Sequence, residues 1–136
     1  MVLTLLLAAQ LAFADIPSDL AVAADQTLPE PSRRAAFDRL ISEGAANPNP
    51  LIIASQTGDE TRLRWVAIRA LGHIGSPQGR TTLVTLLEDP EPAIRTAAIG
   101  ALAEIGDPAY SRRAAELLSD PAVIVRAAAA GALAEM

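Results

Sequence analysis

Residues 63–90 read LRWVAIRALGHIGSPQGRTTLVTLLEDP, and residues 94–121 read IRTAAIGALAEIGDPAYSRRAAELLSDP. Aligned without a gap at a spacing of 31 residues, the two stretches share 12 identical residues in 28 positions. Residues 125–136 begin the pattern again, with 8 identities in 12 positions against residues 94–105. A repeat of this length is typical of solenoids, in which each unit buries its apolar face against its neighbours. The sequence therefore indicates a stack of repeats.

Glycine and proline divide each repeat into two helices. Gly-Ser-Pro at residues 75–77 and Gly-Asp-Pro at residues 106–108 combine a left-handed glycine, a capping side chain and a proline suited to the first helical turn. We expect Asp-Pro at residues 89–90 and 120–121 to cap the next helix in the same way. No segment alternates between apolar and polar residues as a strand does. The sequence predicts an all-α solenoid of stacked antiparallel helix pairs.

A helical period places apolar residues on one face of each predicted helix. In the first helices these are Leu63, Ala67, Ala70, Leu71 and Ile74, with the counterparts Ile94, Ala98, Ala101, Leu102 and Ile105, and in the second helix they are Leu83, Leu86 and Leu87. Only 3% of the 136 residues are aromatic, whereas 51% are hydrophobic. The core is therefore expected to consist of aliphatic side chains.

The beginning of the chain differs from the repeats. Residues 2–13 are uncharged and mostly apolar, and Ala12-Phe13-Ala14 followed by Asp15 is typical of a cleavage site. The stretch is shorter than the roughly 20 residues that span a bilayer. We expect a signal peptide over residues 1–14 and a periplasmic or secreted protein. Because no Lys or Arg follows Met1, a buried helix on the first repeat of a cytoplasmic protein is the alternative.

The remaining chain divides by repeat register. Residues 15–31 contain three prolines and are predicted to be a linker or an N-terminal cover, with a helical turn or two near residues 19–24. Ser32 is expected to cap a helix that ends at Glu43, with Gly44 after it. Residues 32–58 form a degenerate repeat, residues 59–89 and 90–120 form full repeats, and residues 121–136 form a first helix only.

These residues carry a family resemblance. The pattern Arg-x-x-Ala-x-x-Ala-Leu-x-x-Ile-Gly-[Ser/Asp]-Pro, followed by Leu-Leu-x-Asp-Pro, resembles the HEAT-like repeats of the phycobilisome-lyase type, which have an armadillo-type fold. The resemblance covers residues 32–136. It implies a scaffold or binding module, with first helices on the convex side and second helices on the concave side where partners dock. It also implies an alternative, an accessory component of a bilin-lyase-like or oxidoreductase-linked system.

The candidate partner-binding surface follows from that arrangement. It comprises polar side chains of the second helices, namely Gln78, Thr81, Thr85, Glu88, Arg112 and Glu116. Trp65 is added because it lies about 160° from the buried face of its helix. Either residues 15–31 cover Trp65, or Trp65 is an exposed contact residue.

One arginine recurs in every repeat, as Arg64, Arg95 and Arg126. Such a row could bind anions. Alternatively it forms a structural ladder, in which each guanidinium group binds loop carboxylates such as Asp89 and Asp120. The rigid donor fork of arginine suits this bracing role, so we favour the ladder.

Several chemistries are not supported by the composition. The net charge of −5 argues against nucleic-acid binding, and the lack of cysteine excludes disulfides. His73 aligns with Glu104 and Glu135, but equivalent positions on stacked helices lie roughly 8–10 Å apart. We therefore expect a solvated histidine rather than a metal ligand; HEAT-like metalloenzymes carry adjacent His-Glu pairs, whereas His73 precedes Ile74. We expect no catalytic, cofactor or metal site.

The last unit stops within a repeat. We expect Val125, Ala129, Leu133 and Met136 to lack a covering helix. Either the chain is a fragment of a longer solenoid, which we favour, or this end forms a homodimer if the chain is complete. A segment of a longer structural rod is a further alternative function. The leading hypothesis is a non-catalytic scaffold that binds another protein or peptide on its repeat surface.

Overall fold

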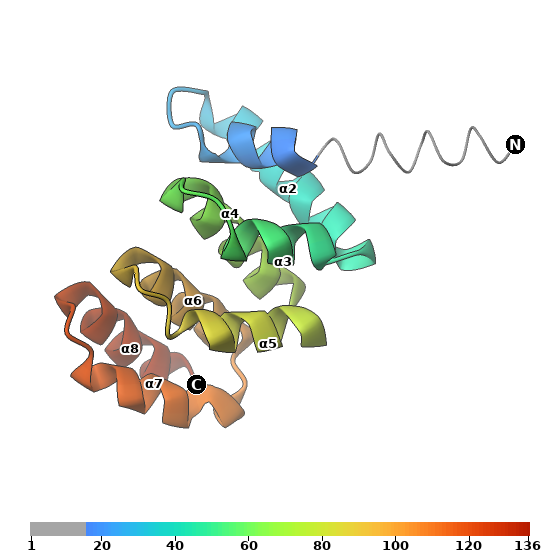
Figure 1. The fold of residues 1–136 in the computed structure, drawn as a ribbon. Coiled ribbons are helices and arrows are strands. Elements are labelled where there is room, and N and C mark those ends of the chain that lie inside the picture. The colour runs from blue at the N-terminus through green and yellow to red at the C-terminus, as the bar shows by residue number, and fades with distance from the viewer. Residues whose placement is uncertain (1–15) are drawn as a thin grey trace, which may run out of the picture.

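A computed structural model describes residues 16–136, so the expected signal peptide lies outside the described residues. Residues 16–24 are helical, and seven α-helices and two short 3₁₀ helices follow. They are α2 (Glu30–Ala46), α3 (Asn49–Gln56), α4 (Thr61–Ile74), α5 (Pro77–Leu86), α6 (Pro92–Ile105), η1 (Pro108–Tyr110), α7 (Ser111–Glu116), η2 (Leu117–Ser119) and α8 (Val123–Glu135). The helices stack in pairs along one axis (Figure 1), and no strand occurs in residues 16–136. The predicted all-α solenoid is confirmed.

Local sequence explains the turns inside each repeat. Gly75 and Gly106 adopt left-handed φ values of 64° and 71° and end α4 and α6. Ser76 then accepts a hydrogen bond from the Gly79 amide at 3.1 Å, and Asp107 accepts one from the Ala109 amide at 2.9 Å. The predicted combination of left-handed glycine, capping side chain and proline is therefore present in both repeats.

The joints between repeats differ from the prediction. Asp89 and Asp120 do not occupy the N-cap positions, because Glu91 precedes α6 and Ala122 precedes α8. Each aspartate instead accepts a hydrogen bond at 2.9 Å from the amide two residues later, which closes a short turn before the helix. The other oxygen of each carboxylate is thereby left for a side-chain partner.

The first helices of successive repeats pack directly against one another, α4 on α6 and α6 on α8. Small residues make this approach possible. A Cβ atom placed on Gly72 would lie 2.8 Å from the Cβ atom and 3.0 Å from the Cα atom of Ala101. The second helices lie farther apart, since α3 and α5 touch only at a few residues.

This packing corrects the expected curvature. In a curved stack, the layer whose helices approach more closely lies on the inner side. Here that layer consists of the first helices, so α4, α6 and α8 line the concave side and α5 and α7 lie on the outer side (Figure 1). The resemblance implied the reverse. The difference arises because small residues such as Gly72 and Ala101 on the facing sides of α4 and α6 let the first helices approach closely.

The recurring arginines lie at the joints. Arg95 donates two hydrogen bonds to the carboxylate of Asp120, both at 2.9 Å, and one at 2.8 Å to the carbonyl oxygen of Asp89. Arg64 donates to Asp89 at 2.5 Å and to the carbonyl oxygen of Ser55 at 2.9 Å. Arg126 binds the Asp120 carbonyl oxygen at 2.8 Å. Each guanidinium group therefore connects the preceding joint to its own helix, and Arg64 and Arg95 also reach the following joint.

The N-terminal segment contains more helix than the predicted one or two turns. Ile16, Leu20 and Ala24 are buried along one side of the helix at residues 16–24. Asp19, which is also buried, accepts hydrogen bonds from Arg39 of α2 at 2.6 and 3.1 Å. This segment is thus a helical cover attached to α2 by an ion pair.

The boundaries of α2 also differ from those predicted. Its N-cap is Pro29, so Ser32 lies inside the helix, and the helix continues past Gly44 to Ala46. Gly44 is a buried contact rather than a terminator, because a Cβ atom there would overlap the side chains of Leu51 and Ile74. Tertiary packing therefore accounts for this glycine.

The C-terminal helix is covered on the predicted face. Val125 and Ala129 are 0% exposed, and Leu133 and Met136 are partly buried. The prediction that they lack a cover is wrong, because α6, α7 and η2 pack against α8. The exposed apolar residues at this end are instead Val123 and Ile124.

Two glycine substitutions test the close approach of α4 and α6. Gly72→Ala is expected to lower the free energy of unfolding by about 1–3 kcal/mol, because the new methyl group overlaps the backbone of Ala101. In Gly100→Ala, on the exposed side of α6, the new methyl group meets no atom within 4 Å. This substitution is expected to raise the free energy of unfolding by up to about 1 kcal/mol. Urea unfolding followed by circular dichroism measures both. Equal, stabilising effects would contradict the close packing.

Acidification tests the joint at Asp120. Hydrogen bonds from Arg95 keep the pKa of the Asp120 carboxyl below the usual 3.8. The ionised carboxylate therefore stabilises the fold above that pH, and its contribution is lost as the pH falls through the lowered pKa. Asp120→Asn is expected to reduce the melting temperature at pH 7 and to differ less from the unmodified protein at about pH 3. Asp59→Asn, at an exposed site, is the charge-matched control, and an equal loss there would contradict the role of Asp120.

Candidate functional site

The predicted second-helix surface is exposed, and most of its side chains make contacts within the protein. Thr81 and Thr85 donate to carbonyl oxygens of α5 at 3.1 and 3.2 Å. Glu88 and Glu116 both bind Arg113, at 2.7 and 2.9 Å. Gln78 and Arg112 lie on α5 and α7, and Arg112 is 3.8 Å from Glu116. None of the six predicted residues lines either of the two hollows described below, and Trp65 lies apart from them on α4.

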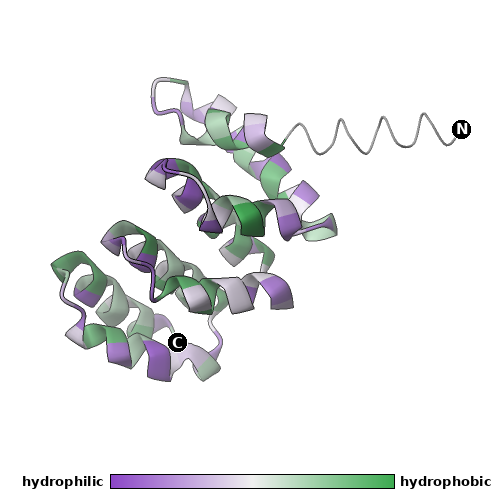
Figure 2. Cartoon of the chain, viewed as in Figure 1, coloured by the Kyte–Doolittle hydropathy of each residue, from purple (hydrophilic) through white to green (hydrophobic). Residues whose placement is uncertain are grey.

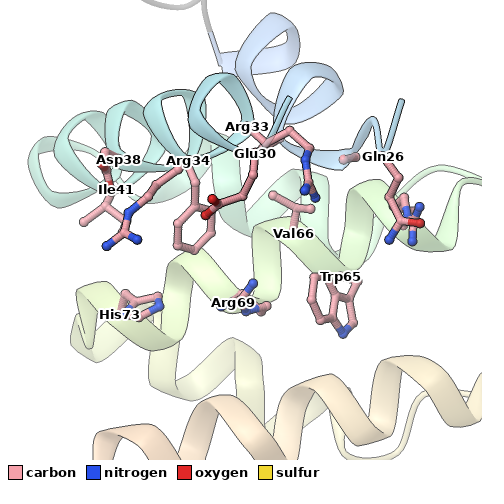
Figure 3. Close-up of a pocket in the computed structure, with 14 residues that line it drawn as sticks. Gln26, Glu30, Arg33, Arg34, Asp38, Ile41, Trp65, Val66, Arg69 and His73 are labelled. Atoms are coloured by element: carbon pink, nitrogen blue, oxygen red, sulfur yellow. The ribbon is translucent and has the colours of Figure 1, made fainter. Parts of the chain in front are cut away.

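A cleft of about 620 Å³ lies between α2 and α4, next to the end of the N-terminal helix. Four arginines line it, Arg33 and Arg34 from α2 and Arg62 and Arg69 from α4, and we call it the arginine cleft. Figure 3 shows side chains of α2 and α4 facing one another across it. The remaining lining residues are Ala23, Ala24, Gln26, Glu30, Phe37, Asp38, Ile41, Trp65, Val66 and His73.

Aromatic rings position one of these arginines. The guanidinium carbon of Arg69 lies 4.9 Å from the centre of the Trp65 ring and 5.2 Å from the centre of the Phe37 ring. Cation–π contacts use the face of a guanidinium group. The N–H donors lie in its plane, so they stay available for a ligand.

The two alternatives for Trp65 are both partly realised. Ala23, Ala24 and Gln26 line the cleft beside it, so the N-terminal segment does lie close to the tryptophan. The residue is nevertheless 39% exposed. Trp65 is therefore sheltered at the edge of a cleft and is still accessible to a ligand.

His73 contacts two other side chains, whereas the sequence predicts a solvated histidine. Its ring lies 5.3 Å from the Phe37 ring in an edge-on contact, and its Nδ1 atom is 2.9 Å from a carboxylate oxygen of Glu104 on α6. The helix spacing suggested that these equivalent positions stay apart. The two side chains are long enough to meet between the helices, which explains the error. Within residues 16–136, no group of three His, Cys, Asp or Glu side chains could bind a metal ion.

The four cleft arginines differ from the other arginines in their partners. Six arginines outside the cleft form ion pairs with carboxylates, namely Arg39, Arg64, Arg80, Arg95, Arg112 and Arg113. Within the described residues, no carboxylate forms an ion pair with a cleft arginine. The Nε atom of Arg33 is buried and makes no hydrogen bond.

The electrostatic balance of the cleft is opposite to that of the chain. Four arginines face two carboxylates, those of Glu30 and Asp38, in a protein with a net charge of −5. Glu30 and Asp38 each lie four residues from Arg34 on α2, a spacing that permits helical ion pairs. Neither carboxylate forms one with it. The cleft therefore presents excess positive charge.

The sequence contained a signal for this cleft that the repeat comparison did not reveal. Arg62, Trp65, Arg69 and His73 follow one another at spacings of 3, 4 and 4 residues, which places them along one exposed side of α4. Figure 2 shows hydrophilic residues along α2 and α4, whereas α6 and α8 are largely hydrophobic. The partner side of the cleft, α2, belongs to the degenerate repeat.

A second, apolar hollow of about 420 Å³ lies between the N-terminal helix, α3 and the start of α4. Ile16, Leu20, Ile53 and Leu63 contribute its apolar surface, and Ile53 is exposed. Among the described helices, none has the length and hydropathy needed to span a membrane.

Comparisons with known proteins agree with this architecture. Residues 48–134 match the family described as HEAT repeats. The structure of human deoxyhypusine hydroxylase in complex with glycerol is similar, with a TM-score of 0.65 and 25% sequence identity. The match covers 95% of this chain but 46% of the hydroxylase, so the chain spans less than half of that protein. No curated protein sequence matches the chain. From the match over most of its repeats, the chain belongs to the HEAT-repeat family.

Proposed function

We propose that this chain is a non-catalytic interaction module that binds a protein or peptide partner in the arginine cleft. HEAT repeats support a scaffold role, because stacked repeats present extended concave surfaces for binding. The observation that carries the proposal concerns the partners of Arg33, Arg34, Arg62 and Arg69. These side chains line one cleft and form no ion pair with a carboxylate of residues 16–136, while arginines elsewhere brace the fold.

The side chains of the cleft favour binding over catalysis. No Ser, Thr, Cys or Lys nucleophile is among its lining residues. Its histidine is already engaged by Phe37 and Glu104. Arginine stays protonated in proteins and cannot serve as a general base near neutral pH. The proposed module acts in an exported compartment if residues 1–14 are a signal peptide, and that location is part of the proposal.

Two alternative functions predict different ligands. An accessory component of a bilin-linked system would bind a tetrapyrrole and shift its visible absorbance. A segment of a structural rod would bind neither a tetrapyrrole nor a discrete partner. The similar hydroxylase is an enzyme, but this chain spans less than half of it. Its activity is not proposed for this chain.

Site-specific photo-crosslinking tests the proposed function. A photoreactive phenylalanine analogue at Trp65 is expected to give one discrete protein adduct in an extract of the source organism. The same analogue at Thr81, exposed on α5, is the matched control and is expected to give none. Excess unlabelled protein should compete the Trp65 adduct away. An adduct from Thr81 alone would contradict the position of the site, and the absence of adducts at both positions would favour the structural rod.

A further inference from the structure

We infer that the arginine cleft recognises an acidic peptide segment, with one carboxylate bound by each of its two walls and an apolar residue between them. This inference rests on the proposed function, because it names the chemistry of the partner that the module would bind. It differs from that proposal in its test, since a synthetic peptide can replace the natural partner.

Two separate walls provide the positive charge. Arg33 and Arg34 extend from α2, and Arg69 extends from α4 on the other side (Figure 3). Arg62 of α4 also lines the cleft. Arginine binds a carboxylate through two parallel N–H donors, so each wall can accept one acidic side chain with defined geometry. No carboxylate of the described residues forms an ion pair with these groups, so a ligand displaces no ion pair within that part of the chain.

The size and lining of the cleft favour a peptide over a single small anion. Its volume of about 620 Å³ far exceeds that of one phosphate or carboxylate group and lies within the range of pockets for larger ligands. Trp65, Val66 and Ile41 add apolar side chains to the lining of the cleft. A peptide that alternates acidic and apolar side chains matches both features.

The same lining disfavours nucleic acid. Glu30 and Asp38 stand inside the cleft and would repel a continuous row of phosphates. The guanidinium group of Arg69 already lies over the Trp65 and Phe37 rings, where a base would need to stack. In a peptide complex, by contrast, the two carboxylates can accept hydrogen bonds from backbone amides.

Trp65 is the only tryptophan of the chain and lies in the cleft, so its fluorescence reports binding directly. The probe is the acetylated peptide Glu-Leu-Asp-Glu-Leu-Asp, and the control peptide has Gln and Asn in place of Glu and Asp. We expect a saturable change in emission with the acidic peptide and at least about tenfold weaker binding of the neutral one. Raising the salt concentration from about 50 to about 300 mM should weaken binding of the acidic peptide.

Matched variants distinguish the loss of a cleft arginine from the loss of one positive charge elsewhere on the protein. Arg34→Gln and Arg62→Gln are each expected to weaken binding about tenfold, by loss of a charge-assisted hydrogen bond. Both side chains are exposed, so the melting temperature should stay unchanged. Arg112→Gln, at a side chain 91% exposed on α7, removes the same charge and should leave binding within about twofold. Isothermal titration calorimetry repeats the measurement without the tryptophan signal.

Three results would overturn the inference. These are equal affinity for the neutral peptide, an equal loss in Arg112→Gln, and tighter binding of a single-stranded oligonucleotide or of inorganic phosphate than of the acidic peptide. The experiments distinguish failure of the proposed interaction module from failure of the proposed acidic ligand. A crosslinked partner at Trp65 together with no acidic-peptide binding would leave the interaction module standing and remove only its proposed ligand class.

Discussion

The close approach of the first helices is the constraint on which the rest of the structure depends. Alanine and glycine residues on the facing sides of α4 and α6 let their backbones come together, as where Gly72 meets Ala101. The second helices approach less closely, since α3 and α5 touch only at a few residues. The stack consequently curves toward the first helices. Their exposed sides, including that of Trp65, become the concave surface.

Arginine has two different uses in this chain. At the joints, Arg64 and Arg95 bind both carboxylates and backbone carbonyl oxygens, so their donors are consumed by the fold. Between α2 and α4, aromatic rings rather than carboxylates position Arg69. An aromatic ring holds the guanidinium group in place without using its N–H donors. This difference in partners, rather than the number of arginines, distinguishes the candidate site from the structural ladder.

Local features of the fold could be predicted from the sequence because they are set by neighbouring residues. The turns at Gly75 and Gly106 follow from left-handed glycine and a capping side chain. The curvature could not be predicted in this way, since it depends on a comparison of distances between two layers of helices. Gly44 shows the same limit: its sequence position suggested a helix end, but its contacts with Leu51 and Ile74 explain it as a packing residue.

The candidate site was predicted only in part. The outward direction of Trp65 follows from helical periodicity, but its neighbours come from α2, and contacts between two repeats do not follow from the periodicity of one helix. The second-helix residues were chosen because the concave side was assigned to the wrong layer. His73 and Glu104 were judged too far apart from the spacing of helix axes, although side-chain length decides whether two such residues meet. Each of these errors concerns contacts between repeats.

Hydrogen–deuterium exchange with and without the acidic peptide tests the central claim, that the functional surface lies on the first-helix side between α2 and α4. The account predicts slower exchange in residues 30–41 and 62–73 when the peptide is present, with no change in α5 or α7. Protection confined to α5 and α7 would contradict it. That result would return the binding surface to the outer layer of second helices.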